Sequence, residues 1–312
     1  MMKKSVFIDH KDGELDPKIF NRIRKHFSSV DFVMSDDPKK LQRVKDADAL
    51  FVKIFTKIDK TVIDAAPKLK FIDVCSTAFD AIDAKYARTK GVTVCNLGAY
   101  SAEAVAEFFF AALLEAGRAL EKAKNQARKE DYSFDKFLGT ELKGKTLGVI
   151  GAGTIGGRIA MISAGFGMNV LYVTKTKKPK LAKFGARKVT LETLAKQSDF
   201  VSINLVLNKE TRGIVSKKII NSFKKGCVVI NLAPPALVDQ DAILARKNIT
   251  FIFDHSDDID PSLAKRFLKT KHCVVYPPVA FRTTEANFSR WDTFAGNIER
   301  FVAGKPQNVV NK

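Results

Sequence analysis

One segment constrains the fold of this chain more than any other: residues 145–160, which read KTLGVIGAGTIGGRIA. This pattern predicts a short apolar strand, a turn that carries Gly151, Gly153 and Gly156, and then a helix. The first glycine permits the tight turn, the second lets backbone approach a pyrophosphate, and the third lets the helix pack closely on the strand. The N-terminus of the helix also directs free N–H groups towards an anion. The segment therefore predicts a dinucleotide site.

Length and composition set broader limits. A chain of 312 residues predicts two domains, and a hydrophobic content of 46% is ample for their cores. No run approaches 18 uninterrupted apolar residues, so we expect no membrane span. The four cysteines show no C-x-x-C spacing, so we expect neither a metal site nor disulfides. Buried free thiols and a cytoplasmic location are the predicted outcome.

The chain is strongly basic, with 53 Lys and Arg against 34 Asp and Glu and a net charge of +19. This excess favours anionic ligands, and binding to nucleic acid or another polyanion is a minor alternative function. However, the lysines are spread over the whole chain, and no basic stretch is interleaved with aromatic residues. A solvated, lysine-rich surface is the favoured interpretation, so we expect no nucleic-acid partner.

Apolar strands alternate with helical segments along most of the chain, which predicts parallel sheets covered on both faces. The first series of strands is predicted at Val6–Ile8, Val30–Met34, Leu50–Phe55, Leu69–Val74 and Val92–Cys95, with helices at Pro17–Phe27 and Thr61–Ala66. A second series begins at Lys145. The nearly all-apolar helix at 99–118 lies between the two series, and we expect it to be buried between domains or subunits. A final helix is predicted at 283–302.

The residues after the predicted strand at 170–173 bear on the choice of cofactor. NAD sites place an Asp or Glu about 20 residues beyond the glycine turn, where it accepts a hydrogen bond from the ribose 2′-OH. Here Thr174 takes that place, and Lys175, Lys177 and Lys178 follow it. A hydroxyl backed by ammonium groups attracts a 2′-phosphate, whereas a carboxylate repels it. We therefore predict NADP(H), with NAD as the alternative if these lysines form only an exposed loop.

These motifs, in this order, resemble the D-isomer-specific 2-hydroxyacid dehydrogenase family from about residue 65 to residue 304. Residues 96–107 resemble the family's interdomain segment, and residues 142–156 resemble its cofactor fingerprint. Later landmarks match at 165–168, 198–201, 210–213 and 238–239. The resemblance implies an α/β fold of two doubly wound parallel-sheet domains. A Rossmann nucleotide domain, residues 98–283, is inserted in a flavodoxin-like substrate domain formed by residues 1–97 and 284–312.

The resemblance also implies a function: hydride transfer between a nicotinamide dinucleotide and a small 2-oxo or 2-hydroxy acid. It implies a homodimer that uses the helix at 99–118. By the same resemblance, Ile155 lies beside the pyrophosphate with Thr154, Asp254 lies near the nicotinamide carboxamide, and Val105 lies near the nicotinamide face. The loop that binds the substrate carboxylate corresponds to Ser76, Thr77 and Ala78.

The chain departs from the family pattern at the reaction centre. Pro234 stands where the family has its arginine, and Pro278 stands where it has its histidine. Asp260 replaces a glutamate, and Ser76 and Ala78 stand where glycines are usual. Proline has no ionisable group and no backbone N–H. The family's ordinary proton transfer, commonly worth about 10²–10⁴-fold in rate, is therefore not available from these two positions.

Two interpretations follow from this contrast. In the first, the protein remains an oxidoreductase with a rebuilt site, in which Lys53 or Arg282 supplies the cation, His255 or Tyr276 the acid, and Asp260 the carboxylate. Each candidate also has a structural explanation, because lone histidines, lysines and arginines are common on solvated loops. In the second, the protein is a catalytically impaired pseudoenzyme that binds a nicotinamide dinucleotide as a structural or regulatory ligand.

Overall fold

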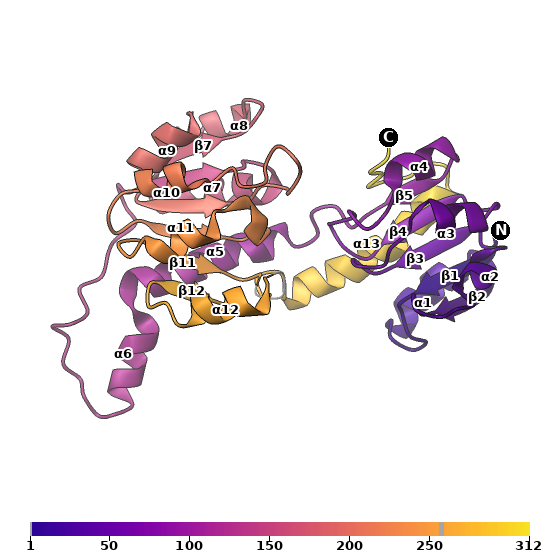
Figure 1. Cartoon of the computed structure of the whole chain (residues 1–312), viewed down its shortest axis with the longest axis horizontal. Helices are drawn as coiled ribbons and strands as arrows, with labels where there is room; N and C mark the ends of the chain where they lie inside the picture. The colour runs from indigo at the N-terminus through magenta and orange to yellow at the C-terminus, as the bar shows by residue number, and fades with distance from the viewer. Residues whose placement is uncertain (1, 256–258) are drawn as a thin grey trace. The chain divides into compact units, whose positions relative to one another are not determined.

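The computed structural model of the chain describes residues 2–255 and 259–312. The chain divides into two compact units (Figure 1): unit 1 contains Met1–Ser101 and Thr283–Lys312, and unit 2 contains Ala102–Arg282. The boundaries expected from the resemblance, 97–98 and 283–284, lie a few residues from these crossings. Among the helices described, none has both the length and the apolar character that a membrane span requires.

Unit 1 is built on a five-stranded parallel sheet in the order β2-β1-β3-β4-β5. The strands are β1 (Met2–Ile8), β2 (Phe27–Val33), β3 (Ala49–Val52), β4 (Phe71–Val74) and β5 (Thr93–Cys95). The helices are α1 (Pro17–Arg24), α2 (Lys40–Val44), α3 (Lys60–Ala65), α4 (Ala84–Thr89) and α13 (Thr284–Val302). The 2-1-3-4-5 order is that of a flavodoxin-like doubly wound sheet, as predicted.

The helix α13 joins unit 1 although it comes from the other end of the chain. Its apolar face contributes Phe294, Ala295 and Ile298 to one core of the unit. There Phe294 packs edge-on against Phe51, with ring centroids 5.4 Å apart. The C-terminal segment is thereby part of the first core rather than an appendage of unit 2.

Unit 2 contains a seven-stranded parallel sheet in the order β12-β11-β10-β9-β6-β7-β8. The strands are β6 (Thr146–Ile150), β7 (Asn169–Val173), β8 (Arg187–Lys188), β9 (Phe200–Ile203), β10 (Val228–Asn231), β11 (Thr250–Phe253) and β12 (Cys273–Val275). The helices are α5 (Ala102–Arg118), α6 (Leu120–Ala127), α7 (Thr154–Gly165), α8 (Pro179–Ala182), α9 (Leu191–Gln197), α10 (Lys217–Ser222), α11 (Gln240–Ala245) and α12 (Pro261–Leu268). This is the Rossmann order, and it confirms the predicted fold class.

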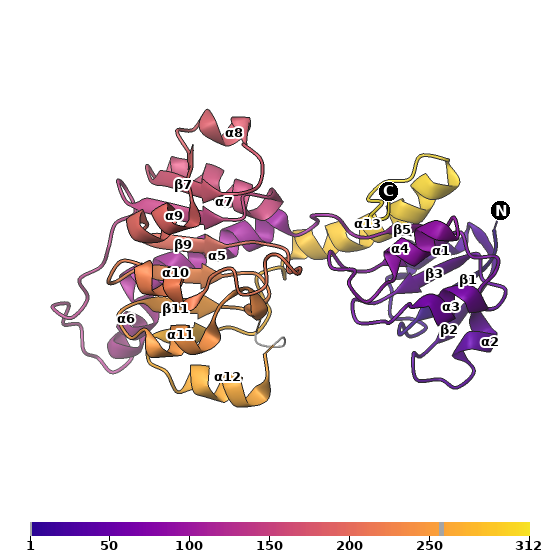
Figure 2. The ribbon, with the colours of Figure 1, turned by 45° about the horizontal axis from the view of Figure 1, so that its top comes forward.

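Successive side chains of a strand in unit 2 point to opposite faces of the sheet, so a strand such as β6 contributes residues to two cores. On β6, Leu147 and Val149 join the core under α5 and α7, whereas Ile150 joins the core under α9, α10 and α11. Figures 1 and 2 show these two helical layers on opposite faces of the sheet. Strands buried on both faces consist mainly of apolar residues, and residues 170–173, 228–230 and 251–253 are continuous apolar runs in such strands.

Several predicted boundaries were wrong. The strand predicted at 50–55 ends at Val52, because the next N–H, that of Lys53, bonds to Thr56 Oγ1 in a turn at 3.2 Å. The helix predicted at 17–27 ends at Arg24, and Phe27 instead begins β2. The exposed two-residue strand β8 was not predicted at all.

The cysteine prediction can be compared with the structure directly. All four cysteines are free; Cys75, Cys95 and Cys227 are buried, and Cys273 is partly buried. The expectation of free thiols is confirmed, and the expectation of burial holds for the first three.

Candidate functional site

The glycine turn after β6 has the geometry that the sequence predicted. Gly151 adopts φ +93°, in the left-handed region, and a Cβ there would lie 2.8 Å from Asn204 O. A Cβ on Gly156 would lie 2.1 Å from Gly151 O, so only glycine lets α7 pack this closely. By contrast, a Cβ on Gly153 would meet nothing within 4 Å. The backbone at Gly153 is therefore open to a ligand.

The first turn of α7 follows Gly153, and no side chain caps it. The N–H groups of Thr154, Ile155 and Gly156 stand at the first three helical positions, where no intrahelical acceptor exists. These N–H groups and the positive end of the helix dipole form a site for an anion of phosphate type. The open space at Gly153, together with the uncapped N–H groups of the first turn of α7, fits the pyrophosphate of a dinucleotide.

The helix α5 lies against α7 beside this turn. Val105 is buried in the core that α5 and α7 share, and Ile155 packs against the same core. On the surface, Arg158 donates to both carboxylate oxygens of Glu103, at 2.7 and 2.6 Å, and links the two helices. Val105 and Ile155 thus both contact the core that α5 and α7 share.

The segment after β7 carries the predicted cations. Thr174 is half-buried, and Lys175 and Lys177 are exposed. Lys175 pairs with Glu210, but both side chains are largely exposed, so the pair has little energetic weight. A further cation arrives from β8, because Lys188 Nζ donates to Lys175 O at 2.9 Å. This lysine was not predicted, since a two-residue exposed strand has no apolar signature.

The carboxyl ends of β10, β11 and β12 lie at the same edge of the parallel sheet as the glycine turn. Asp254 follows β11 and is buried, and its Oδ2 accepts a hydrogen bond from Ala280 N at 3.0 Å. This bond ties the segment around Pro278 to the end of β11. His255 is partly exposed, and its Nε2 lies 3.8 Å from Asp254 Oδ1. An imidazole beside a carboxylate is therefore present, although not at the family's usual position.

Three other predicted residues, Asp260, Arg282 and Tyr276, differ in their surroundings. Asp260 caps the N-terminus of α12: its carboxylate accepts hydrogen bonds from Ser262 and Leu263, which lower its pKa. Arg282 is exposed and has no ion pair among the described residues. Tyr276 packs edge-on against Phe108, with ring centroids 5.4 Å apart, and burial raises the pKa of its phenol.

The predicted substrate loop follows β4 in unit 1. Two of its backbone carbonyl groups accept hydrogen bonds from side chains: Asn96 Nδ2 donates to Thr77 O at 2.6 Å, and Ser76 Oγ donates to Ala78 O at 2.7 Å. The backbone N–H groups of Thr77 and Ala78 have no acceptor among the described residues, and both residues are exposed. Because the carbonyls of Thr77 and Ala78 already accept hydrogen bonds and their N–H groups are free, the loop suits the binding of a small anion. It does so although Ser76 and Ala78 stand where the family usually has glycines.

Lys53 lies at the same edge of the unit 1 sheet, directly after β3. Its Nζ pairs with Glu14 Oε1 at 2.6 Å. Glu14 Oε1 also lies 3.8 Å from Nδ1 of His10. Burial lowers the pKa of the His10 imidazole to about 4, and neither ring nitrogen has a hydrogen-bond partner among the described residues. Lys53 is therefore largely neutralised, which weakens its case as the substrate cation.

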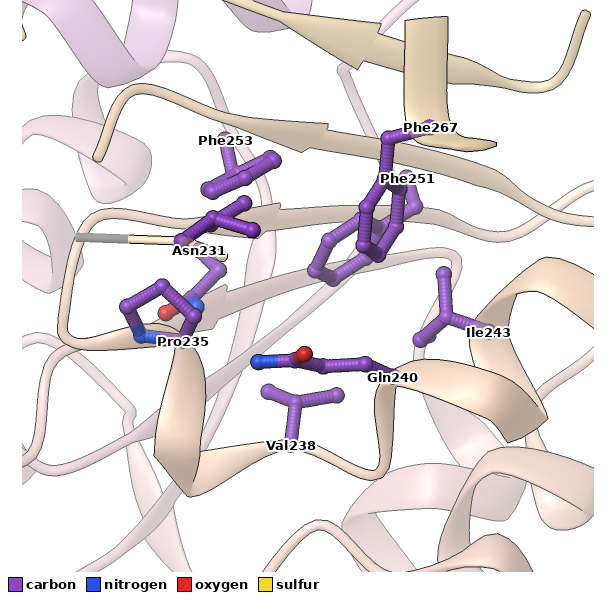
Figure 3. Close-up of a pocket in the computed structure, with 9 residues that line it drawn as sticks. Asn231, Pro235, Val238, Gln240, Ile243, Phe251, Phe253 and Phe267 are labelled. Carbon is purple, nitrogen blue, oxygen red and sulfur yellow. The ribbon is translucent and has the colours of Figure 1, made fainter. Parts of the chain in front are cut away.

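A small cavity in unit 2 is separate from the glycine turn (Figure 3). It lies among β10, β11, α11 and α12 and is lined by Asn231, Pro235, Val238, Gln240, Ile243, Phe251, Phe253, Ile259 and Phe267. The space open to the centre of a water molecule is about 10 Å³, which suits one water at most. Asn231 Nδ2 has no hydrogen-bond partner among the described residues, so a single water would satisfy it. The cavity is too small for a dinucleotide.

Comparison with known proteins agrees with this geometry. Residues 110–280 match the family model for the NAD-binding domain of D-isomer specific 2-hydroxyacid dehydrogenases. A glyoxylate reductase of Thermococcus litoralis is 32% identical over 329 residues, which cover 100% of this chain and 98% of that enzyme.

Solved structures share the whole architecture. A D-lactate dehydrogenase of Aquifex aeolicus, in complex with NAD and lactic acid, superposes with a TM-score of 0.86 at 26% identity, covering 99% of each chain. An acyclic imino acid reductase in complex with NADPH and D-Arg superposes with a TM-score of 0.85 at 27% identity, covering 99% of this chain and 100% of that one. The chain belongs to the D-isomer specific 2-hydroxyacid dehydrogenase family.

Proposed function

We propose that this protein is an NAD(P)-dependent oxidoreductase that transfers hydride between a nicotinamide dinucleotide and a small 2-oxo or 2-hydroxy acid. The observation that carries the proposal is the glycine turn, where Gly156 leaves no room for a Cβ and the first N–H groups of α7 are uncapped. Family membership supports the same reaction type, since relatives are glyoxylate reductases and a D-lactate dehydrogenase.

In this proposal, different residues bind the pyrophosphate, the nicotinamide and the substrate carboxylate. The N–H groups of Thr154 and Ile155 hold the pyrophosphate, and Val105 packs beside the nicotinamide. When bound, the dinucleotide supplies the hydride. The N–H groups of Thr77 and Ala78 bind the carboxylate of the substrate, because their carbonyls are already bonded and their donors are free.

The proton transfer in this proposal uses His255 and Asp254. His255 Nε2 lies 3.8 Å from Asp254 Oδ1, and in this proposal the imidazole donates a proton to the forming hydroxyl. Arg282, exposed and without an ion pair among the described residues, supplies positive charge near this segment. Asp260 keeps its carboxylate as a helix cap, so its part is to fix the start of α12.

NADP(H) is the proposed cofactor, with NAD as the alternative. No carboxylate follows β7: Thr174 takes that position, Lys175 and Lys177 come next in the chain, and Lys188 Nζ donates to Lys175 O. A relative of this chain binds NADPH. Fixed positive charge near the ribose favours a 2′-phosphate.

We also propose a homodimer in a reducing, cytoplasmic setting. The segment after α6 exposes Tyr132, Phe134 and Leu138, at 78%, 80% and 98% of their surface. Exposed apolar residues this close in sequence mark an interaction surface. Four free thiols agree with a reducing compartment. Light scattering that gives twice the chain mass supports the dimer, and a single chain mass contradicts it.

The test of the proposed activity is consumption of NADPH with glyoxylate or pyruvate, followed by absorbance. Turnover that saturates with the acid supports the proposal. Tight NADPH binding without turnover of any 2-oxo acid, at high enzyme concentration, would instead support the pseudoenzyme alternative.

A further inference from the structure

Arg290 on α13 is a cation that the family pattern does not account for. Its Nη2 donates to Cys75 O at 3.3 Å, in the residue that begins the substrate loop. The guanidinium carbon also lies 4.8 Å from the centroid of the Trp291 ring. Both contacts are within unit 1, so the position of this guanidinium depends on one compact body.

Arg290 differs from Arg22 in its ionic contacts. It forms no ion pair with a carboxylate in the part of the chain that the structure describes, and its Nε is buried without a hydrogen-bond partner there. Arg22, which packs against the same helix, pairs with Glu299 at 2.9 Å and Asp292 at 2.7 Å. Cations withdrawn from water are normally paired, so an unpaired guanidinium calls for an anionic partner.

The surroundings of Arg290 suit a carboxylate. The adjoining loop offers the free N–H groups of Thr77 and Ala78. A guanidinium presents its donors in a planar fork that matches the two oxygens of a carboxylate. Lys53 is at the same sheet edge, but Glu14 already neutralises it. Of these two cations, Arg290 is the one without an ion pair among the described residues, and a single guanidinium suits a monocarboxylate better than a dicarboxylate.

We propose that Arg290 binds the carboxylate of a short 2-oxo monocarboxylic acid, together with the N–H groups of Thr77 and Ala78. This inference rests on the proposed function and assigns the anionic end of the substrate to unit 1. Arg290 thereby supplies a positive charge that Pro234 cannot provide. It is a substrate-binding residue, and proton transfer belongs to other groups.

The chain offers a direct probe of this binding. Trp291 is its single tryptophan, and the Arg290 guanidinium lies over its ring. Oxamate, a non-reactive analogue of a 2-oxo acid, should change the fluorescence of Trp291 on titration, both without dinucleotide and with NADP⁺. Arg290→Gln should weaken oxamate binding about tenfold to a hundredfold, the loss typical of one charged hydrogen-bonding partner. Arg290→Lys, which keeps the charge but loses the fork, should fall between the two.

The control is Arg300→Gln, which removes the same charge from an exposed arginine on the same helix. It should bind oxamate as the unsubstituted protein does. Thermal unfolding of all three variants checks that each is folded. In turnover of glyoxylate, Arg290→Gln should raise KM by the same factor as the oxamate dissociation constant, with kcat changed by much less.

The outcomes separate this inference from the proposed function. Equal oxamate affinity and KM in Arg290→Gln and Arg300→Gln would overturn the inference while leaving hydride transfer intact. Equally tight binding of a dicarboxylate such as oxaloacetate would overturn the choice of a monocarboxylate. A protein that binds oxamate through Arg290 but binds no dinucleotide would support the inference and contradict the proposed oxidoreductase function.

Discussion

At the scale of single residues, the glycine turn shows that neighbouring glycines have different roles. A methyl group on Gly156 would collide with backbone, whereas one on Gly153 would point into open space. The first requirement concerns packing of α7 on β6, and the second concerns access for a ligand. The two roles can be separated by substitution.

Gly153→Ala should lower the stability of the free protein by no more than about 1 kcal/mol, because its Cβ meets no atom and only the preference for glycine at the N-cap is lost. It should nevertheless remove most of the rise in melting temperature that NADPH causes, since the new methyl occupies the approach of the pyrophosphate. Thermal unfolding with and without NADPH measures both effects. Gly157→Ala, whose Cβ also meets nothing within 4 Å, is the matched control and should retain the shift.

His255 is the proposed general acid, and its substitution tests that role. His255→Gln should lower kcat about 10²–10⁴-fold, the usual contribution of a general acid, with little change in melting temperature because the side chain is partly exposed. Steady-state kinetics measure the effect. His272→Gln is the control: its Nε2 contacts Ile243 O at 3.0 Å, so it should change stability and not kcat. Unchanged kcat in His255→Gln would remove this histidine from the proposed chemistry.

The residue scale also shows where sequence reasoning stops. Gly151, Gly153 and Gly156 could be predicted because their spacing is local and each glycine has a separate role: the tight turn, access for a ligand, and the packing of α7. Arg290 could not, since Cys75, its neighbour in space, is 215 residues away in the chain. The approach of Asn204 O to Gly151 could not be predicted either, because the two residues are far apart in the chain.

At the scale of elements, the strand β4 contains an unusual buried acid. Asp73 is fully buried; its Oδ1 accepts a hydrogen bond from Asn297 Nδ2 at 2.9 Å, and its Oδ2 has no partner among the described residues. Burial raises the pKa of this carboxyl well above its usual value. The folded state therefore keeps a proton that the unfolded chain releases above about pH 4.

This difference has a definite sign. Between about pH 4 and the raised native pKa, the folded state binds more protons, so the contribution of Asp73 to stability falls as pH rises, by about 1.4 kcal/mol per pH unit. Asp73→Asn should remove this component of the slope. Chemical denaturation of both proteins from pH 5 to pH 8 measures it; parallel pH profiles would show that Asp73 does not titrate as described.

Thr174, directly after β7, bears on the choice between NADP(H) and NAD. Thr174→Asp places a carboxylate where it can accept from a ribose 2′-OH and repel a 2′-phosphate. The ratio of NADPH to NADH affinity should fall at least about tenfold, equivalent to about 1.4 kcal/mol. Competing fluorescence titrations measure the ratio. Thr176→Asp, two residues further along the same exposed segment, is the control for added charge alone.

Strands could be predicted from the sequence where burial requires mainly apolar residues. Central strands such as β9 and β10 are buried on both faces and appeared as apolar runs. The strand β8 could not be predicted, because its two exposed residues, Arg187 and Lys188, pair with β7 only through backbone. The end of β3 was misplaced because Ile54 and Phe55 continue the apolar run into a turn at the surface.

At the scale of the whole molecule, the order of elements determined the fold class. Two series of alternating strands and helices gave two parallel sheets, in 2-1-3-4-5 and Rossmann orders. The return of α13 to unit 1 followed from the family resemblance rather than from periodicity, since an amphipathic helix does not specify its partner. The net charge of +19 agrees with anionic ligands but does not select among them.

The proposed function depends on the binding of a nicotinamide dinucleotide by the uncapped turn between β6 and α7. Isothermal titration calorimetry of the unsubstituted protein with NADPH and with NADH tests it most directly. We expect saturable heat with one dinucleotide per chain, tighter binding of NADPH, and loss of that heat in Gly153→Ala. No heat with either dinucleotide, from a protein shown to be folded, would contradict it.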